Sequence, residues 1–373
     1  MLKIAINTRL LLPGSLEGIG YYVQELCQRL PELLPETQFL FCFDRPFDPR
    51  LVAHPRVSGK VIFPPTRDPL LWKVWFDYCL PRVIRDWGAD IFFSPDGYCS
   101  LHTDIPQVMV LHDVAFAHYR DHLPDRVQRY YERNVPLFLN KSAQVITVSD
   151  FVRQDLHGRY GTPLNKISVA GNGVKPIFRP ATTENIAVTR DRYSEGLPYL
   201  FYLGAVHPRK NIGALIGAYS LFRERTERRV PLLLGGRLAW QNESVKAAHA
   251  ASVYKRDIHF LGYLPENELA NILAAALAMI YPSLSEGFGV PLLEAMHAEV
   301  PILCSQATSL PEVGGAAALY FDPHSVPAIA AAIERVVADG ALRKHLIGEG
   351  RIQRERYSWQ QTAERIAAIL RRP

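Results

Sequence analysis

The stretch Ser-Leu-Ser-Glu-Gly-Phe-Gly-Val-Pro-Leu-Leu-Glu-Ala-Met, residues 283–296, carries the most informative pattern in the chain. An apolar run that predicts a strand ends just before it, near Pro282. Its glycines allow a tight turn, and Pro291 suits the first position of a helix. Glu286 lies in the turn and Glu294 in the first turn of that helix. A strand, a glycine turn and a helix in this order predict the ligand-binding edge of a parallel α/β sheet.

The two carboxylates flank backbone groups that suit a polar ligand. The free N–H groups at a helix start can bind hydroxyls or an anion, and a carboxylate beside them can accept two hydrogen bonds from a sugar diol. Two other interpretations stay open. In one, Glu294 only favours the helix dipole and Glu286 is only solvated. In the other, the pair is the acid and base or nucleophile of a glycosidase, about 5 to 9 Å apart.

Short apolar runs alternate with helical patterns on both sides of this stretch, which predicts parallel sheets covered by helices on both faces. Glycine, proline and polar residues fill 170–198, so we expect a linker there and two consecutive α/β units. The default active site of such a pair is the cleft between them. The predicted strands are 2–6, 91–93, 108–111, 145–148, 199–203, 231–234, 259–261, 278–281 and 301–304, and two predicted helices are 127–140 and 150–160.

Three further loops follow predicted strands and carry candidate chemistry. Arg209 and Lys210 come after the strand 199–203, where a guanidinium fork and an ammonium suggest a phosphate site; the alternative is a solvated loop. Gly18 and Gly20 form a phosphate-approach surface or a plain turn, because their spacing is neither a dinucleotide nor a Walker pattern. His112 follows the run 108–111 and suits a sugar hydroxyl or a proton transfer, unless it is a structural histidine.

Composition excludes several classes of protein. The net charge of +5 is evenly spread, unlike that of a nucleic-acid binder. The five cysteines form no CxxC pair, which favours reduced thiols over a zinc site or disulfides. We expect no metal, since Asp-x-Asp and HExxH are missing from the sequence. No apolar run approaches the roughly 20 residues of a spanning helix, and the first residues lack a signal-peptide pattern, so we expect a cytoplasmic protein.

Together these motifs resemble the family 4 retaining glycosyltransferases, which have the GT-B fold of two Rossmann-like domains facing across a cleft. Glu286 and Glu294 look like the E-x7-E motif of that family, and the match covers nearly the whole chain. The remaining motifs occur in family order at Gly18–Gly20, Val110–Asp113, Thr147–Ser149, Asn172–Val174, Gly204–Asn211 and Ser309–Val313.

The resemblance implies domains at 1–176, for the acceptor, and 177–357, for a nucleotide-sugar donor, with the helical segment 358–373 packing back on the first. It implies that Arg209 and Lys210 bind the diphosphate and that Glu294 takes the ribose hydroxyls. Neither a cofactor nor a covalent protein nucleophile is implied. The other implied donor contacts are Glu286 with the Gly287-Phe288-Gly289-Val290 turn and His112 at the sugar, Gly204, Gly18 and Gly20 at the diphosphate, and Gly262 and Tyr263 at the base.

The variants of these motifs look most like mannosyltransferases of bacterial surface polysaccharides, which implies GDP-mannose as donor and a glycan or lipid-linked glycan as acceptor. A UDP-sugar such as UDP-glucose is the competing donor. A nucleotide-sugar epimerase and a non-catalytic nucleotide-sugar binding subunit are the competing functions. The segment 70–87, with Trp72, Trp75, Phe76 and Trp87, predicts either a core-facing helix or an amphipathic helix that touches a membrane or the acceptor.

Overall fold

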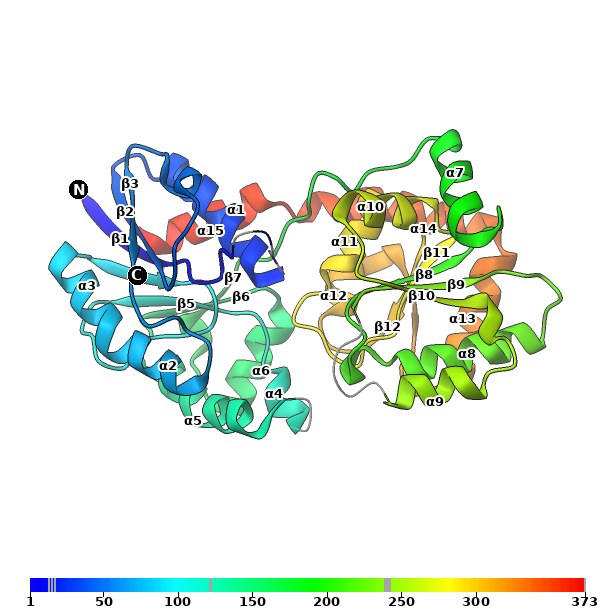
Figure 1. Ribbon diagram of the computed structural model, residues 1–373, viewed down its shortest axis with the longest axis horizontal. Coiled ribbons are helices and arrows are strands. Elements are labelled where there is room, and N and C mark those ends of the chain that lie inside the picture. Colours follow the sequence, from blue (N-terminus) through cyan, green and yellow to red (C-terminus); the bar gives the residue numbers. More distant parts are fainter. Residues whose placement is uncertain (13, 15, 17, 121–122, 238–242, 372–373) are drawn as a thin grey trace. The chain divides into compact units, whose positions relative to one another are not determined.

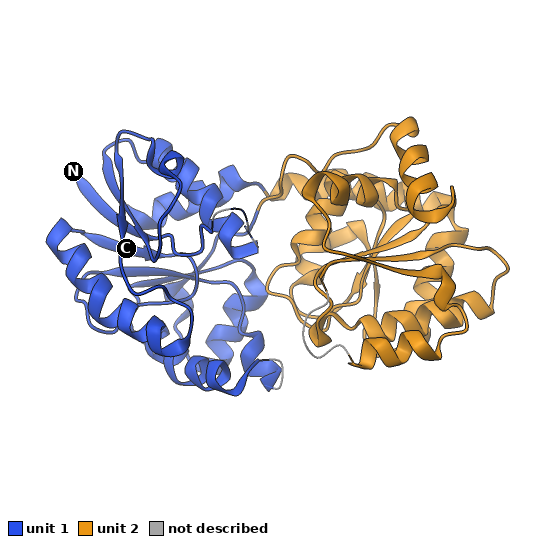
Figure 2. Ribbon diagram, in the orientation of Figure 1, with its two compact units in different colours: residues 1–172, 358–373 blue, residues 173–357 orange. Residues whose placement is uncertain are grey.

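The computed structural model describes residues 1–373 except 13, 15, 17, 121–122, 238–242 and 372–373. The chain forms two compact units, coloured separately in Figure 2. Unit 1 comprises residues 1–172 and 358–373, and unit 2 comprises residues 173–357. The sequence placed the boundary after residue 176, and the structure places it after Asn172, at the start of the linker-like stretch.

Unit 1 is built on a seven-stranded parallel sheet in the order β3-β2-β1-β4-β5-β6-β7. Its strands are β1 (Leu2–Asn7), β2 (Thr37–Phe43), β3 (Val57–Val61), β4 (Ile91–Ser94), β5 (Gln107–Leu111), β6 (Gln144–Thr147) and β7 (Ile167–Val169). Its helices are α1 (Gly18–Leu33), α2 (Pro69–Val74), α3 (Leu80–Trp87), α4 (Ala115–His118), α5 (Asp125–Lys141), α6 (Asp150–Tyr160) and α15 (Trp359–Leu370).

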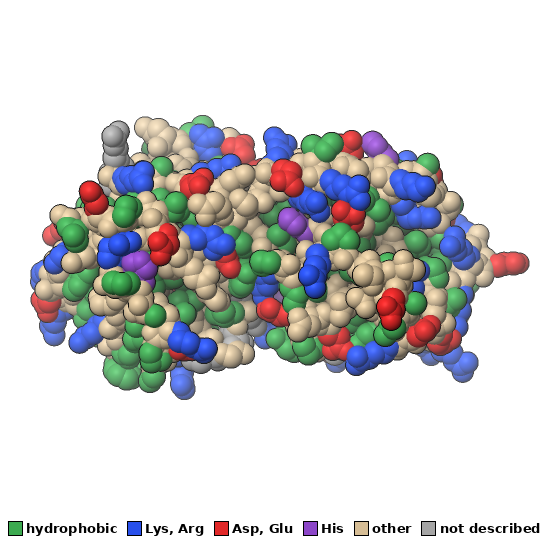
Figure 3. All heavy atoms as spheres, turned by 90° about the horizontal axis from the view of Figure 1, so that it is seen from above, with side chains coloured by type: hydrophobic (Ala, Val, Ile, Leu, Met, Phe, Trp, Pro, Cys, Tyr) green, Lys and Arg blue, Asp and Glu red, His purple; other side chains and the backbone are tan. Residues whose placement is uncertain are grey.

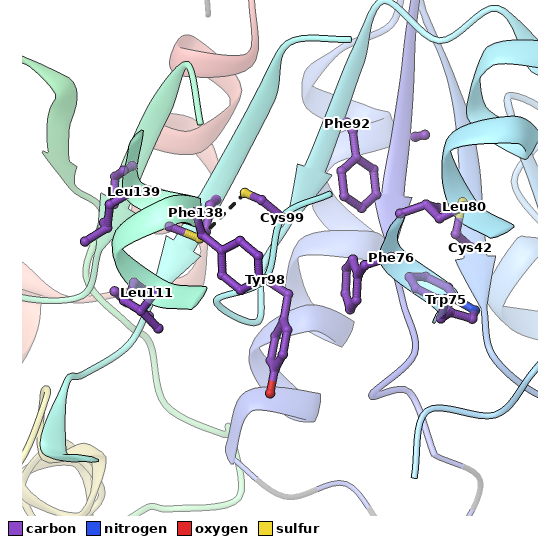
Figure 4. Packing of buried hydrophobic residues seen from close by; sticks show 14 of the residues in the cluster. Cys42, Trp75, Phe76, Leu80, Phe92, Tyr98, Cys99, Leu111, Phe138 and Leu139 are labelled. Carbon is purple, nitrogen blue, oxygen red and sulfur yellow. Dashed lines mark hydrogen bonds between the residues drawn. The ribbon is translucent and has the colours of Figure 1, made fainter. Parts of the chain in front are cut away.

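One apolar cluster of unit 1 lies between a face of this sheet and helices α3, α5 and α6. Figure 4 shows part of it, including Phe76 and Tyr98, whose rings stack at 5.3 Å between centroids. Trp75 and Phe76 are fully buried, and the Trp75 indole donates to the carbonyl of Ile62 at 2.8 Å. The segment 70–87 therefore turns its central aromatic residues into the core rather than outward. Trp72 stays half-buried.

Helix α15 packs on α1 within unit 1, as Figure 1 shows in red and blue. Trp359 meets Tyr21 and Tyr22 of α1 edge-on, at 5.7 and 5.5 Å between ring centroids. Arg365 and Thr362 donate to the carbonyl of Ala170, just after β7. The last helix thus returns to the first unit after the chain has completed the second.

Unit 2 is built on a six-stranded parallel sheet in the order β10-β9-β8-β11-β12-β13. Its strands are β8 (Leu200–Leu203), β9 (Leu232–Gly235), β10 (Ile258–Gly262), β11 (Ala278–Tyr281), β12 (Ile302–Ser305) and β13 (Ala318–Phe321). Its helices are α7 (Thr183–Ser194), α8 (Ile212–Glu224), α9 (Glu243–Ala251), α10 (Glu266–Ala275), α11 (Val290–His297), α12 (Leu310–Gly314), α13 (Val326–Ala338) and α14 (Gly340–Gln353).

Helices cover both faces of the second sheet. Helices α8, α9 and α13 pack together on one face, and α7, α10, α11 and α14 lie on the other (Figure 1). The central strands are buried throughout, as is typical of a parallel sheet between two helical layers. Because β8 and β11 are neighbours, the loops that follow them meet at one edge of the sheet.

The surface is mixed in charge. Basic and acidic side chains are interspersed on the face shown in Figure 3 and gather in no single-sign patch there. Within the described part of the chain, none of the helices has the length and apolar character needed to cross a bilayer. Among those same residues, no group of three or more His, Cys, Asp and Glu side chains is arranged to hold a metal ion.

Candidate active site

The site of unit 2 is built where the chain leaves β8 and β11. A short 3-10 turn, Pro208–Lys210, follows β8, and its Arg209 carbonyl accepts from Leu284 N at 2.9 Å. Asn211 adopts a left-handed backbone with φ of 60°, which asparagine tolerates better than most residues. Its amide donates to the carbonyls of Pro282 and Pro323, at 3.2 and 2.7 Å. The loop after β8 is thereby tied to the loop after β11.

Glu286 is the centre of a buried hydrogen-bond cluster in this loop pair. Its side chain is only 9% exposed. Lys210 Nζ lies 2.5 Å from Glu286 Oε1, which also accepts from Ser283 Oγ at 2.5 Å and from the Tyr281 hydroxyl at 2.9 Å. Arg209 Nη1 lies 3.2 Å from Glu286 Oε2. One carboxylate therefore holds both predicted phosphate-binding cations at the edge of the sheet.

The electrostatic balance keeps Glu286 ionised. Burial alone would raise its pKa, but the charges of Lys210 and Arg209 outweigh it, as do hydrogen bonds from Lys210 and Ser283. The pKa of Glu286 is lowered to about 2 as a result. A solvated carboxylate, the alternative weighed from the sequence, does not describe this residue.

The glycine turn is held by the loop between β12 and α12. The backbone N–H of Glu286 donates to Thr308 Oγ1 at 3.0 Å, and Ser309 Oγ donates to the carbonyls of Glu286 and Phe288 at 2.9 and 3.1 Å. Gly289 has a φ of 96°, and a Cβ there would lie 2.6 Å from a Leu310 methyl group. Glycine is therefore required both by backbone conformation and by space.

Glu294 differs from Glu286 in its surroundings. It lies half-buried in α11, and among the described residues no hydrogen bond or ion pair reaches its carboxylate. Burial raises its pKa to about 7, against the opposing charge of Lys175. One carboxyl group of raised pKa and one of lowered pKa are also found in glycosidase pairs, so the pKa contrast alone does not identify the chemistry.

The other predicted donor contacts of unit 2 also follow strands of this sheet, at the carboxyl ends of β8 and β10. Gly204, after β8, has a φ of 147°, and a Cβ on the neighbouring Gly236 would lie 1.9 Å from the Gly204 carbonyl oxygen. Gly262 ends β10 with a φ of 68°, and its carbonyl accepts from Gly236 N at 2.8 Å. Tyr263 follows and is 79% exposed. Its ring is therefore available to a ligand.

His112 lies in unit 1, directly after β5. Its Nε2 lies 2.9 Å from the Pro95 carbonyl oxygen, so this nitrogen carries the proton and donates it. The Tyr22 ring packs edge-on against it at 4.8 Å between centroids. Burial lowers the pKa of His112, so the imidazole is neutral near pH 7 and its Nδ1 is a hydrogen-bond acceptor.

The predicted glycine loop of unit 1 is described only in part, since residues 13, 15 and 17 lie outside the described residues. Gly18 begins α1 and has open space around the position of a Cβ. Gly20 is buried, and a Cβ there would lie 2.7 Å from the Leu10 carbonyl oxygen. Close packing of α1 on the preceding loop explains this second glycine without a ligand.

Comparison with known proteins identifies the chain. A family model described as glycosyl transferases group 1 matches residues 189–353, and one described as glycosyltransferase family 4 matches residues 16–177. O-antigen chain mannosyltransferase B of Escherichia coli is 32% identical over 363 residues, which cover 92% of this chain and 93% of that protein. The chain belongs to the family 4 and group 1 glycosyltransferases.

Solved structures show the same fold for this glycosyltransferase. Sucrose-phosphate synthase from Thermosynechococcus elongatus superposes with a TM-score of 0.78 at 18% identity, over 100% of this chain and 98% of that one. WaaG, a glycosyltransferase involved in lipopolysaccharide biosynthesis, superposes with a TM-score of 0.77 at 15% identity, over 99% and 100% of the two chains. The fold is GT-B, as the resemblance implied.

For a glycosyltransferase, this edge of unit 2 offers a pair of held cations, an ionised hydrogen-bond acceptor in Glu286, and in Glu294 a carboxyl group with no hydrogen bond or ion pair among the described residues. Sequence reasoning found Arg209, Lys210 and both glutamates. It missed Tyr281 and Thr308, which complete the cluster and the turn. Position after a strand is the only signal that could have found Thr308; Tyr281 reads as a buried strand residue.

Proposed function

We propose that this glycosyltransferase transfers mannose from GDP-mannose to a glycan or lipid-linked glycan acceptor in the synthesis of a surface polysaccharide, with retention of the anomeric configuration. The O-antigen mannosyltransferase of Escherichia coli supports the sugar and the pathway class, because its similarity spans nearly the whole of both chains. Serotype-specific mannosyltransferase WbdA is 29% identical over 269 residues, but this chain spans only 32% of its length.

The single observation that carries the proposal is the Glu286-centred cluster with Arg209 and Lys210. As the bond to the anomeric carbon breaks, negative charge develops on the leaving diphosphate and positive charge on the sugar ring. Two cations fixed before the reaction stabilise the first charge without reorganising. The ionised Glu286 fixes them, because each is within 3.2 Å of one of its oxygens.

Glu294 supports the nucleotide end of the proposed donor. A carboxylate can accept both hydrogen bonds of a ribose diol, and this one has no protein donor within the described part of the chain. In the proposed mechanism the acceptor hydroxyl attacks from the side of the leaving group, and a phosphate oxygen takes its proton. We propose in addition that His112 contacts the donor sugar and that Gly18 and Gly20 contact the diphosphate.

Calorimetry of the protein against GDP-mannose, GDP-glucose, UDP-glucose and UDP-galactose tests the donor. We expect micromolar binding of GDP-mannose and at least tenfold weaker binding of the UDP-sugars. Preference for a UDP-sugar would contradict the donor assignment.

Product analysis then separates the competing functions, because an epimerase alters the free nucleotide sugar and a binding subunit turns over nothing. Transfer should continue in the presence of EDTA, because we propose that Arg209 and Lys210 stabilise the negative charge on the leaving diphosphate. Loss of activity in EDTA would contradict this account.

We also propose a cytoplasmic location with peripheral contact to the membrane if the acceptor is lipid-linked. All five cysteines are free thiols, as a reducing compartment maintains them. Leu70 and Tyr78 are 67% and 58% exposed on the segment 70–87, beside exposed Lys73 and Arg82. Flotation with acidic liposomes tests the contact, and recovery of all the protein in the unbound fraction would refute it.

A further inference from the structure

A second polar cluster lies at the carboxyl edge of the unit 1 sheet and contains none of the residues assigned to the donor, although Asp96 follows Pro95, whose carbonyl accepts from His112. Arg9 follows β1 and Asp96 follows β4, and both are less than a tenth exposed. Arg9 Nε lies 2.5 Å from Asp96 Oδ2, and Arg9 Nη1 donates to Thr66 Oγ1 at 3.3 Å. Apolar residues of the same volume often stabilise a fold as well as a buried ion pair does, and this pair lies where parallel sheets bind ligands.

Aromatic rings surround this ion pair. The Arg9 guanidinium lies 4.3 Å from the centre of the Tyr98 ring and 6.0 Å from that of Trp72. Trp72 in turn meets Tyr130 edge-on at 5.2 Å. Trp72, Tyr130 and Tyr131 are half-buried, so part of each ring faces outward. Figure 4 shows the Tyr98 hydroxyl pointing away from the labelled apolar side chains of the core.

The polar tips of this cluster retain hydrogen-bonding capacity. Tyr98 donates its hydroxyl hydrogen to the Tyr131 hydroxyl at 2.8 Å, which leaves the hydrogen of Tyr131 for another acceptor. Among the described residues, the Tyr130 hydroxyl makes no hydrogen bond, and neither does Arg9 Nη2. Partly exposed aromatic rings, with tyrosine hydroxyls that can still donate, suit a ligand that has an apolar face and a rim of hydroxyls.

We propose that Trp72, Tyr130 and Tyr131, with the Arg9–Asp96 pair beneath them, form the subsite for a neutral hexose of the acceptor glycan. A pyranose has a C–H face that packs on an aromatic ring and hydroxyls that reach the tyrosines and Arg9. Charge favours a neutral sugar over a phosphate, because Asp96 already balances Arg9. The proposal of this subsite rests on the proposed function, because the subsite would bind the acceptor of that transfer.

Saturation-transfer NMR with methyl α-D-mannopyranoside tests the subsite without any donor. We expect saturation of the ring C–H protons with wild-type protein and at least a fivefold weaker effect with Tyr130→Ala. Tyr131→Phe keeps the ring and removes only the hydroxyl, so it tests the site even if Tyr130→Ala folds poorly. Leu137→Ala is the matched control, because Leu137 is an exposed apolar residue of α5, the helix that carries Tyr130, and lies outside the cluster.

Steady-state kinetics with an oligomannoside acceptor gives the second readout. Loss of one aromatic contact should raise the acceptor KM about five- to tenfold in Tyr130→Ala, with the donor KM unchanged. Folded variants with unchanged acceptor KM and NMR effect would overturn the subsite, as would a wild-type cluster that binds inorganic phosphate instead. A wild-type protein that binds mannoside but no sugar nucleotide overturns the proposed function and leaves the hexose site standing.

Discussion

Replacing Glu286 by glutamine should destabilise unit 2 at neutral pH. The substitution keeps the size of the side chain but removes the charge that pairs with Lys210 and Arg209, whose side chains are 13% and 21% exposed. The pKa of Glu286 is lowered from 4.5 to about 2 in the folded protein. At 1.36 kcal/mol per pKa unit, this corresponds to about 3 kcal/mol of stability that depends on the charge.

The pH dependence follows from the sign of that shift. A carboxyl group whose pKa is lowered by folding stabilises the folded state above its unfolded pKa, and this contribution disappears as pH falls toward the folded value. The difference in stability between wild type and Glu286→Gln should therefore reach its full value at pH 7 and shrink between about pH 4.5 and pH 2.

Differential scanning calorimetry measures the effect. For a unit of this size, about 3 kcal/mol corresponds to a fall in Tm of about 6 to 12 °C at pH 7. Glu334→Gln is the matched control, because Glu334 pairs with Arg225 on the exposed surface of the same unit, and such pairs contribute about 0 to 1 kcal/mol. A Tm for Glu286→Gln within 2 °C of wild type at pH 7, on the scale of the same conversion, would refute the electrostatic account of this cluster.

Three further outcomes follow from the site. Lys210→Met should lower kcat for transfer about 10²- to 10³-fold, the usual loss for one electrostatic contact to developing charge, and an unchanged kcat would contradict the role of this lysine. Donor affinity should rise with pH as Glu294 ionises near its pKa of about 7, whereas Glu294→Gln should bind independently of pH in the same titration. Gly289→Ala should lower the free energy of unfolding by about 1 to 3 kcal/mol, because Gly289 has a φ of 96° and the added Cβ would lie 2.6 Å from a Leu310 methyl group. Gly348→Ala, at a helix position with open space around the added Cβ, should leave the free energy of unfolding undiminished and is the control.

Hydrophobic runs in the sequence predicted most of the buried strands. The predicted runs 108–111 and 278–281 coincide with β5 and β11 within a residue, and the helix 150–160 coincides with α6. β2, β3, β7 and β13 were not identified. β3 is an edge strand whose residues alternate between half-buried and exposed, so its sequence Val-Ser-Gly-Lys-Val lacks the apolar run that marks a central strand.

By itself, the sequence determined which strands are followed by glycine turns, basic side chains or carboxylates, because these features are local. It also determined two α/β units, since apolar runs repeat on both sides of a linker-like stretch. Only the tertiary structure decided which of these groups meet. Arg209 and Glu286 are 77 positions apart, and they pair because β8 and β11 are neighbours in the sheet. Strand order and side-chain direction depend on the packing of the whole unit, which local sequence does not specify.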